Sequence, residues 1–216
     1  MSNAAVYVLL GPPGSGKGTQ AKLIAPKLKL PHISLGDLLR EAVRSNSKIG
    51  QLAKGYLEAG KLVPDEVVIQ VAEESMRRPE AMSGFVVDGF PRTLAQAKLF
   101  DELLKKLNFE IIKVLYIDLG LEGILKRLTG RRSCRKCGAV YHVEFNPPKI
   151  ANVCDACGGE LYQRHDDTSD VIKVRYEVYS KETLPLMDFY KKSGKLLKVN
   201  GARPVQEVFK ELSDSV

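Results

Sequence analysis

The sequence has no apolar run long enough to cross a membrane. The longest such run near the N-terminus, Ala4 to Leu10, is far shorter than the roughly 20 residues of a spanning helix. No basic segment precedes it and no small-residue cleavage site closes it, so it lacks the pattern of a secretory signal. We therefore expect a soluble, cytoplasmic protein.

The composition shows neither the low hydrophobicity of disordered chains nor the glycine excess of collagen-like ones. Hydrophobic residues make up 44% of the 216 residues and charged residues 27%. The chain also has no internal repeat and no low-complexity tract. Its length is sufficient for one or two domains, each with a hydrophobic core.

Acidic residues are absent from one strongly basic stretch. The chain as a whole carries 33 Lys and Arg against 26 Asp and Glu, a formal net charge of +7. The basic residues of the stretch are Lys126, Arg127, Arg131, Arg132, Arg135 and Lys136. This pattern predicts an anionic ligand. Nucleic-acid binding and an ordinary solvated surface are the alternatives for the overall basic balance.

Cysteine is absent except in one short segment with two C-x-x-C pairs, formed by Cys134, Cys137, Cys154 and Cys157. The residues between the pairs, 138–153, give a spacing typical of zinc sites. Glycine follows each pair, at Gly138 and Gly158, and permits the positive φ of a tight turn. Four thiolates close the coordination shell, so the metal would be structural. Two disulfides are disfavoured in a cytoplasmic chain, and iron in place of zinc stays open.

The segment around the cysteines, 131–165, is rich in turn residues and poor in aliphatic ones. It therefore has little material for a hydrophobic core of its own. Metal binding would supply the missing folding free energy, which is on the order of 10 kcal/mol in small zinc modules.

A glycine-rich segment follows the first apolar run. The run Ala4–Leu10 is continuously apolar, as expected for a strand buried on both faces of a parallel sheet. It leads into residues 11–19, GPPGSGKGT, and then into a helix that we expect to end near Pro26. The N–H groups of such a loop bind phosphate, and Lys17 adds a full positive charge. Gly18 stands where the strict pattern has Ser or Thr, and the absence of G-x-G-x-x-G disfavours a dinucleotide-dependent oxidoreductase.

Strand-like and helix-like stretches alternate along the rest of the chain, which predicts a parallel α/β sheet. The further strands are expected at His32–Ser34, Gly84–Val87, Ile111–Ile117 and Lys195–Val199. Helices are expected at Gly36–Arg44, Ile49–Ala59, Asp65–Arg77, Leu94–Leu107, Leu121–Leu128, Ser169–Tyr190 and Val205–Leu212. Two short helices before Val63, with no strand between them, indicate a small helical insertion. The cysteine segment is a second insertion.

Polar residues follow the ends of the predicted strands, where parallel sheets place their ligands. Asp88 follows one strand, at the position where a nucleotide enzyme keeps the acid that orients Mg²⁺; a simple turn cap is the alternative. Arg40 follows another strand at a helix start and is expected to point inward. Further arginines at loop–sheet junctions are Arg92, Arg131, Arg164 and Arg175. Such a set predicts that a polyanion binds at this edge.

Several of these motifs occur together in one chain: Gly11–Gln20, Ile33–Arg40, Gly60–Asp65, Asp88–Gln96, Thr129–Arg132, the four cysteines, Arg164–Asp167 and Asn200–Pro204. In this combination the chain resembles the adenylate kinase family, in its long form with a zinc-binding lid. The resemblance implies the P-loop nucleoside monophosphate kinase fold, an α/β fold with a parallel five-stranded sheet flanked by helices. It implies a core domain of residues 1–33, 64–130 and 166–216, a helical NMP-binding insertion of 34–63 and a zinc-bearing lid of 131–165. The lid is expected to close over both substrates.

The resemblance implies reversible phosphoryl transfer from MgATP to AMP, giving two ADP, by a monomer that binds no nucleic acid and no membrane. The implied catalytic residues are Lys17, Arg92, Arg131, Arg164 and Arg175. The implied ATP-binding residues are Gly14, Ser15, Gly16, Lys17, Gly18, Thr19, Arg127 and Arg131, together with Val140, Tyr141 and Arg203 through their backbone. The implied AMP-binding residues are Arg40, Lys61, Leu62, Val63, Gly89, Phe90, Pro91, Arg92, Gln96, Arg164 and Arg175. Asp88 is implied for the Mg²⁺ shell, Asp166 and Asp167 for lid closure, and Cys134, Cys137, Cys154 and Cys157 for structural Zn²⁺.

The chain departs from the family pattern at two positions. Leu35 replaces the threonine beside the AMP base and cannot hydrogen-bond that base, so a kinase for UMP, CMP or another nucleoside monophosphate is the first alternative. Pro26 stands where the first helix usually continues and predicts a shortened or kinked helix. A nucleic-acid-binding ATPase is the second alternative. It is weakened by the lack of aromatic residues near the cysteines beyond Tyr141, Phe145 and Tyr162.

Overall fold

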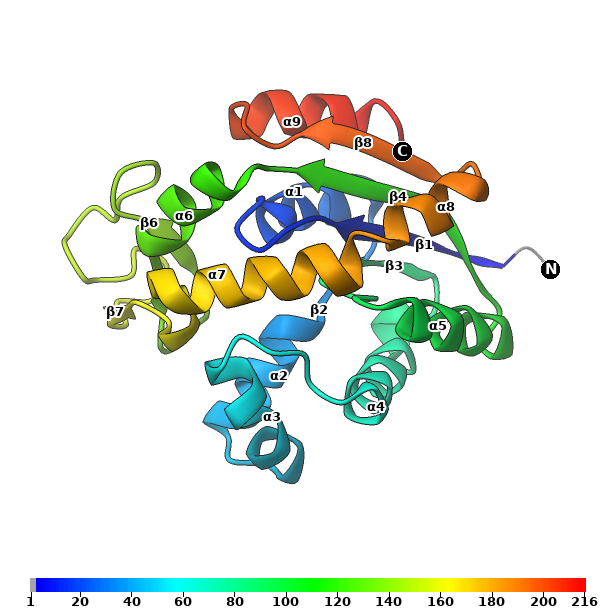
Figure 1. Cartoon of the computed structure of the whole chain (residues 1–216), viewed down its shortest axis with the longest axis horizontal. Coiled ribbons are helices and arrows are strands. Elements are labelled where there is room, and N and C mark those ends of the chain that lie inside the picture. The colour runs from blue at the N-terminus through cyan, green and yellow to red at the C-terminus, as the bar shows by residue number, and fades with distance from the viewer. Residues whose placement is uncertain (1–2) are drawn as a thin grey trace.

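A computed structural model of the chain describes residues 3–216. It contains a parallel five-stranded sheet with the strand order β2-β3-β1-β4-β8 and a separate antiparallel three-stranded sheet with the order β6-β5-β7 (Figure 1). The strands of the main sheet are β1 (Ala4–Leu10), β2 (His32–Ser34), β3 (Gly84–Asp88), β4 (Phe109–Asp118) and β8 (Leu196–Asn200). The strands of the small sheet are β5 (Arg131–Cys134), β6 (Val140–His142) and β7 (Leu161–Tyr162).

Helices connect and cover these strands. The α-helices are α1 (Lys17–Leu28), α2 (Leu35–Arg44), α3 (Lys48–Glu58), α4 (Asp65–Met76), α5 (Leu94–Lys106), α6 (Leu121–Thr129), α7 (Ser169–Val178), α8 (Leu186–Lys192) and α9 (Val205–Ser213). Shorter segments are the 3₁₀ turns η1 (Pro79–Ala81) and η2 (His165–Asp167) and the π-helical segment η3 (Tyr179–Thr183). Within residues 3–216, none of the helices combines the length and apolar character needed to cross a bilayer.

The main sheet is buried on both faces, as the continuous apolar run of β1 predicts. Val6 and Val8 of β1 belong to one apolar core, which also includes Phe100 of α5. Leu9, on the opposite face of the same strand, belongs to a second core with Ile24 of α1. Helices α4, α5 and α8 contribute to the first core, and α1 and α9 to the second. The predicted fold class, a parallel five-stranded sheet flanked by helices, is therefore confirmed.

The carboxyl ends of β1, β2 and β3 meet at one edge of the sheet. In the parallel register, Leu9 of β1 pairs with Asp88 of β3, and Asp88 pairs with Ser34 of β2. Loops that leave parallel strands at this edge come close together, although they are far apart in the sequence. The glycine-rich loop and the segment after Asp88 are two such loops.

Two groups of elements project beyond this edge. In Figure 1, α2 and α3 lie below the main sheet, and the small sheet lies at the left, beside the N-terminal end of α7. The first group follows β2 in the chain and the second follows α6. Helix α7 runs from the small sheet back across the front of the molecule toward α8.

The structure differs from the sequence-based expectations in a few elements. The single helix expected over Ser169–Tyr190 is wrong, because the chain forms α7, the π-helical η3 and α8 instead. Pro185 has no N–H and cannot donate to the preceding turn, so the helix is interrupted there. Helix α1 contains Pro26 but continues to Leu28, where Lys29 ends it with φ 57°. The small sheet was not expected from the sequence at all.

Candidate active site

The glycine-rich loop joins β1 to α1, and its shape depends on glycine. Gly11 has φ 146° and Gly14 has φ 77°. A Cβ at Gly11 would lie 2.3 Å from the carbonyl oxygen of Ile117, and a Cβ at Gly14 would lie 2.8 Å from Cγ of Leu128. The loop therefore packs tightly against β4 and α6 while it leads into the N-terminus of α1. This is the arrangement that binds phosphate through backbone N–H groups.

Lys17 is the first residue of α1, and its ammonium group lies over the loop. Its Nζ donates to the carbonyl oxygens of Gly11 and Pro12, both at 2.8 Å. Burial lowers the pKa of Lys17 from 10.5 to about 7, Asp88 opposes this effect, and nearby arginines, Arg92 foremost, reinforce it. A bound anion would raise this pKa again, because it favours the charged form of the amine.

Five arginines from separate parts of the chain lie close enough to influence one another's ionisation. They are Arg40 on α2, Arg92 after β3, Arg131 on β5, Arg164 before η2 and Arg175 on α7. Burial lowers the pKa of Arg92 to about 10, with further lowering by Arg175 and Arg40. Burial also lowers the pKa of Arg164 to about 9, again with Arg40 contributing. We call these arginines and Lys17 the cation cluster; negative charge is needed to offset their mutual repulsion.

Two neighbouring aspartates, one fully buried and one partly buried, hold Arg131 and Arg175 in place. Asp167 is fully buried and accepts from Nε and Nη2 of Arg131 at 2.8 Å and 2.6 Å. It also accepts from Nη1 of Arg175 at 3.2 Å. Asp166 pairs with the same Nη1 at 2.9 Å. The bidentate contact fixes the plane of the Arg131 guanidinium, which a single contact would leave free to rotate.

Asp37 links α2 to the segment that precedes η2. Its carboxylate lies 2.6 Å from Nη2 of Arg40 and 3.9 Å from Nη2 of Arg164. Burial raises the pKa of Asp37, but Arg40 and then Arg164 outweigh this effect and lower it to about 2. The carboxylate therefore stays charged at neutral pH. It attracts Arg40 of α2 and Arg164, which follows the last strand of the small sheet.

Asp88 ends β3 at the same edge of the sheet. Its Oδ2 lies 2.6 Å from Nε2 of His32 on β2. The coulombic influence of Asp88 on Lys17 and on Arg92 places it within the cation cluster. The contact with His32 orients the carboxylate and uses one of its oxygens, so the other oxygen can accept from a ligand.

A largely apolar cavity lies beside Arg92. Its lining residues are Leu35, Gly36, Leu39, Leu57, Lys61, Leu62, Val63, Val68, Gly89, Arg92 and Gln96. Leu35 is only 1% exposed and belongs to the core that continues beneath the cavity. The predicted AMP-binding residues Lys61, Leu62 and Val63 thus share one cavity with Gly89 and Gln96.

Local helix capping explains the position of Gln96 in this cavity. Oγ1 of Thr93 accepts from the backbone N–H of Gln96 at 3.0 Å and begins α5, as a T-x-x-Q pattern predicts. The side-chain Oε1 of Gln96 accepts a hydrogen bond from the backbone N–H of Arg92 at 2.8 Å. Its Nε2 donates to Oδ1 of Asp65, the first residue of α4, at 2.7 Å.

The four cysteines form one cluster whose sulfur atoms all lie within 4.8 Å of one another. Sγ atoms of Cys134 and Cys157 are 3.5 Å apart, and those of Cys137 and Cys154 are 3.6 Å apart. All four are free cysteines, and the spacing is close to the ~3.8 Å edge of a tetrahedron with Zn–S bonds of ~2.3 Å. Gly138 and Gly158 have φ 73° and 68°, as predicted for the turns. The residues therefore fit a tetrahedral metal ion, and the disulfide alternative is not supported.

Comparison with known proteins agrees with this geometry. A family model described as adenylate kinase matches residues 9–195. An adenylate kinase of Archaeoglobus fulgidus is 51% identical over 205 residues, which cover 95% of this chain and 94% of the relative. The chain belongs to the adenylate kinase family. Further adenylate kinases, of Clostridium botulinum strain Langeland and of Methanocella arvoryzae, are 50% identical over 207 residues and 46% identical over 210. The matched parts cover 96% of both chains in the first case and 97% of both in the second.

Some residues assigned to ATP in this adenylate kinase family member lie outside the cation cluster. Val140 is 40% exposed on β6. The neighbouring Tyr141 lies against the cysteines, with its hydroxyl 3.5 Å from Sγ of Cys154. Arg127 donates to the carbonyl oxygens of Ser15 and Gly201 at 3.2 Å and 2.7 Å, so it joins the glycine-rich loop to the segment after β8. The backbone contacts with ATP that the resemblance implies for Val140 and Tyr141 stay predictions, and the position of the Tyr141 side chain against the cysteines is compatible with them.

Two further predicted residues have partners that limit their possible roles. The ring of Phe90 is fully buried and packs edge-on against Phe100 at 4.9 Å. The ring is therefore part of the core, and the contact of Phe90 with AMP stays a prediction. Arg203 forms an ion pair with Glu211 of α9. The backbone contact with ATP that the resemblance implies for Arg203 would leave this ion pair intact.

Sequence reasoning missed four residues that organise the site: His32, Asp37, Asp65 and Thr183. Asp37 stood in a motif that carries the family resemblance, and its spacing from Arg40 is a signal for an ion pair on a helix. Asp65 also stood in such a motif, Gly60–Asp65, but nothing in its spacing predicted a contact with Gln96, and His32 and Thr183 carried no signal of either kind. Each contacts a site residue from which it is separated by dozens of positions in the sequence.

Proposed function

We propose that the cation cluster carries out the reaction of the adenylate kinase family, the reversible transfer of a phosphoryl group from MgATP to AMP, giving two ADP. The single observation that carries the proposal is the convergence of Lys17 and five arginines beside a glycine-rich loop. The comparisons support the same reaction over nearly the full chain. They give no support to the UMP or CMP alternative.

At the donor end, Gly14 to Thr19 hold the phosphates of ATP, with backbone N–H groups and the Lys17 ammonium as donors. Arg127 stabilises the loop from the opposite side through Ser15 and frames the adenine site. Kinase chemistry requires Mg²⁺ with ATP, which neutralises phosphate charge. Asp88 is the residue that would hold this ion, because its carboxylate lies at the loop edge and offers an oxygen ligand.

At the acceptor end, Arg40, Arg92, Arg164 and Arg175 hold the phosphate of AMP and the transferring group. The cavity beside Arg92 takes the base and ribose between Lys61 to Val63 and Gln96. Asp166 and Asp167 fix the lid-side arginines once the lid is closed. Segments 34–63 and 131–165 act as the NMP-binding insertion and the lid around a core of 1–33, 64–130 and 166–216.

The chemistry needs no general base, because the phosphate of AMP is already a nucleophile near neutral pH. The barrier lies in bringing two polyanions together and in spreading charge over the moving phosphoryl group. Fixed guanidinium groups lower this barrier because they are oriented before the reaction begins. Loss of one such arginine lowers the rate by a factor of ~10³–10⁵ in related nucleotide enzymes. We therefore expect replacement of Arg92 or Arg131 to remove most of the phosphoryl-transfer activity.

The metal at the four cysteines is proposed to be zinc in a structural role. Four thiolates complete its coordination, so it offers no open position to a substrate. The cluster has a small apolar surround, to which Tyr141 and Leu161 contribute. Iron is the alternative, and the metal content of purified protein decides between the two.

We also propose that the chain acts as a cytoplasmic monomer without a nucleic-acid partner. Within the basic stretch, Lys126 pairs with Glu144 and Arg135 pairs with Glu160. Arg131 is bound to buried Asp167. Three cations of the basic stretch are therefore paired with carboxylates of the same chain, which lowers the positive charge that this stretch could offer to a nucleic acid.

An acceptor assay tests the function. Purified protein with MgATP is offered AMP, GMP, UMP or CMP, and ADP formation is followed by a coupled reaction. We expect AMP to be phosphorylated with the highest kcat/KM. Preference for a pyrimidine would overturn the acceptor assignment, and conversion of none of the four would overturn the function. Retention of RNA or DNA at moderate salt would favour the nucleic-acid-binding ATPase.

A further inference from the structure

The side-chain amide of Gln96 is held between two partners of opposite hydrogen-bonding character. The backbone N–H of Arg92 can only donate, and it meets Oε1 at 2.8 Å. The carboxylate of Asp65 can only accept, and it meets Nε2 at 2.7 Å. If the amide turned over, two donors would face each other at Arg92 and two acceptors at Asp65. These contacts therefore impose a single orientation on the amide.

Each end of this amide still has one hydrogen-bonding position to offer. A carbonyl oxygen has two lone pairs and an NH₂ group has two hydrogens, and each contact uses only one of them. Gln96 is 1% exposed and lines the cavity beside Arg92. The other side chains that line the cavity are apolar or cationic. Gln96 is thus the neutral polar side chain of this cavity that can form hydrogen bonds with the polar edge of a base.

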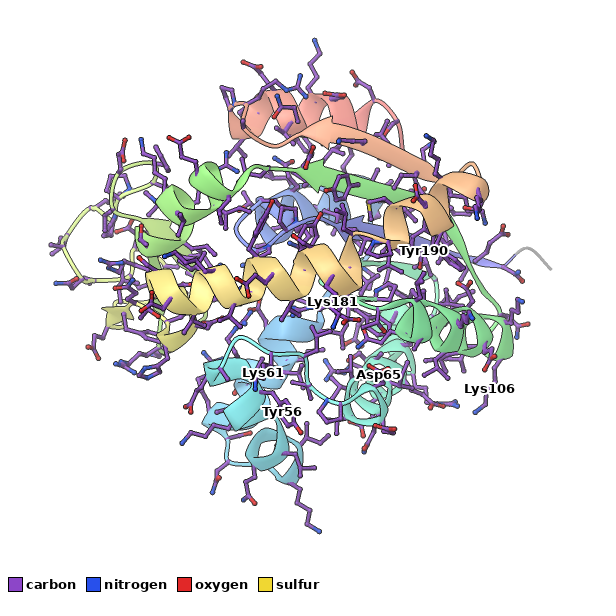
Figure 2. All side chains as sticks on the ribbon, in the orientation of Figure 1. Tyr56, Lys61, Asp65, Lys106, Lys181 and Tyr190 are labelled. Atoms are coloured by element: carbon purple, nitrogen blue, oxygen red, sulfur yellow. The ribbon has the colours of Figure 1, made fainter. Side chains whose placement is uncertain are left out.

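The residue that fixes the amide lies on a different element from Gln96. Asp65 begins α4, while Gln96 lies in the first turn of α5. Figure 2 labels Lys61, which lies within the segment that joins α3 to α4, and Asp65, which begins α4 directly after that segment. Lys61 also lines the cavity, so this short segment bounds the cavity and orients Gln96.

We propose that Asp65 is a specificity-determining residue that makes the cavity accept a 6-aminopurine monophosphate and reject a 6-oxopurine one. This rests on the proposed function, in which the cavity takes the acceptor base. A 6-aminopurine offers an N6–H donor beside the N1 acceptor, and a 6-oxopurine offers an O6 acceptor beside an N1–H donor. With the amide fixed, Oε1 receives N6–H and Nε2 donates to N1. A 6-oxopurine would instead face acceptor with acceptor and donor with donor.

The phosphate end of the acceptor prevents the base from avoiding this mismatch. Arg92 lines the cavity and belongs to the cation cluster, so a phosphate bound there anchors the nucleotide at one end. With the phosphate anchored, rotation about the glycosidic bond moves the N1–C6 edge of the base away from Gln96 and does not reverse the order of its donor and acceptor. Buried polar groups left unpaired give strong discrimination between substrates, whereas apolar contacts such as those of Leu35 give little. The orientation of Gln96 therefore compensates for the leucine at position 35.

The test compares AMP with IMP, because IMP has the 6-oxo edge without the additional amino group of GMP. We measure kcat/KM for both acceptors, and KM for MgATP, in wild type, D65A, D65N and E66A. We expect the ratio of kcat/KM for AMP to kcat/KM for IMP, the AMP:IMP ratio, to fall by about tenfold or more in D65A. KM for MgATP should be unchanged. In D65N, whose amide can present either end to Gln96, we expect a fall of about threefold or more. E66A, an exposed acid in the same helical turn, should keep the ratio within a factor of two.

The outcomes separate this proposal from the proposed function. A merely structural role of Asp65 would lower activity with both acceptors equally and leave the ratio unchanged. If D65A does not fold, the nearly isosteric D65N decides alone. A ratio within a factor of two of wild type in every folded Asp65 variant overturns the proposal, as does a wild type that uses IMP as well as AMP. Failure of the wild type to phosphorylate AMP would overturn the function itself.

Discussion

The hydroxyl of Thr183 donates a hydrogen bond of 2.8 Å to the backbone carbonyl oxygen of Arg92. Thr183 ends the π-helical segment η3 and is only 6% exposed. The π-helical segment therefore connects the backbone of one arginine of the cation cluster to the helix that carries another, Arg175. Segments of this kind within helices often mark functional positions.

The first prediction concerns this contact. T183V keeps the shape of the side chain but leaves the partly buried carbonyl of Arg92 without its donor. We expect a loss of stability of about 1–3 kcal/mol and a decrease in kcat of several-fold, because Arg92 is no longer fixed. Steady-state kinetics and thermal unfolding measure the two effects. T183S retains the hydroxyl and should stay close to wild type; equal kcat in T183V and wild type would show that Arg92 does not need this contact.

The second prediction concerns the protonation of Lys17. Its folded-state pKa is lowered to about 7, so the amine is largely neutral at pH 8 in the free enzyme. Binding of the ATP phosphates favours the ammonium form and raises the pKa. We therefore expect proton uptake on binding of MgATP at pH 8, and affinity that decreases as the pH rises above about 7. Calorimetry in buffers of different ionisation enthalpy measures the uptake.

The control for this titration is a lysine that lies outside the site, at the opposite end of the same helix. K29M replaces an exposed lysine after α1 and should retain the proton uptake of wild type. K17M should lose it. The same uptake in K17M and wild type would assign the proton to another group of the cation cluster.

The third prediction concerns Asp167, which is fully buried between two arginines. D167N removes the negative charge and turns one amide N–H group toward a guanidinium. Breaking a buried ion pair in this way costs about 3–5 kcal/mol, and we expect kcat to fall by at least about tenfold because Arg131 loses its orientation. Chemical denaturation and kinetics measure both effects. D170N changes an exposed acid on α7 and should be neutral; a D167N protein as stable as wild type would contradict the assignment.

The fourth prediction concerns the cysteine cluster. We expect about one zinc ion per chain, and a lower melting temperature after chelation, because metal binding contributes folding free energy. Activity should persist in part at low temperature, since the metal does not touch substrate. C137S should reproduce the loss of metal without chelator. Unchanged melting of the metal-free protein would rule out the structural role.

The phosphate loop and the cysteine cluster could be predicted from the sequence because each is a local pattern. Gly11 to Lys17 follow one strand directly, and the cysteines lie within one short segment, so spacing alone predicts their chemistry. The arginines required one more inference, that the carboxyl ends of parallel strands meet at one edge. The convergence of Arg40, Arg92 and Arg175 in the structure agrees with that inference.

The contacts that orient these groups could not be predicted. Asp65 contacts Gln96 because α4 packs against α5, and Thr183 contacts Arg92 because η3 lies against the segment that precedes α5. A single sequence contains no spacing rule for such tertiary contacts. The break at η3 was missed for a related reason, because helical periodicity continues through Pro185 and hides the interruption.

The polarity of the main sheet has a practical consequence for labelling. Every strand of this sheet runs in the same direction, so Ala4 begins β1 at the margin opposite the glycine-rich loop. At ~3.3 Å per residue, the length of β1 separates that margin from Gly11 by roughly 20 Å. A dye or affinity handle attached ahead of Ala4 would thus emerge on the far side of the molecule and leave nucleotide entry unobstructed.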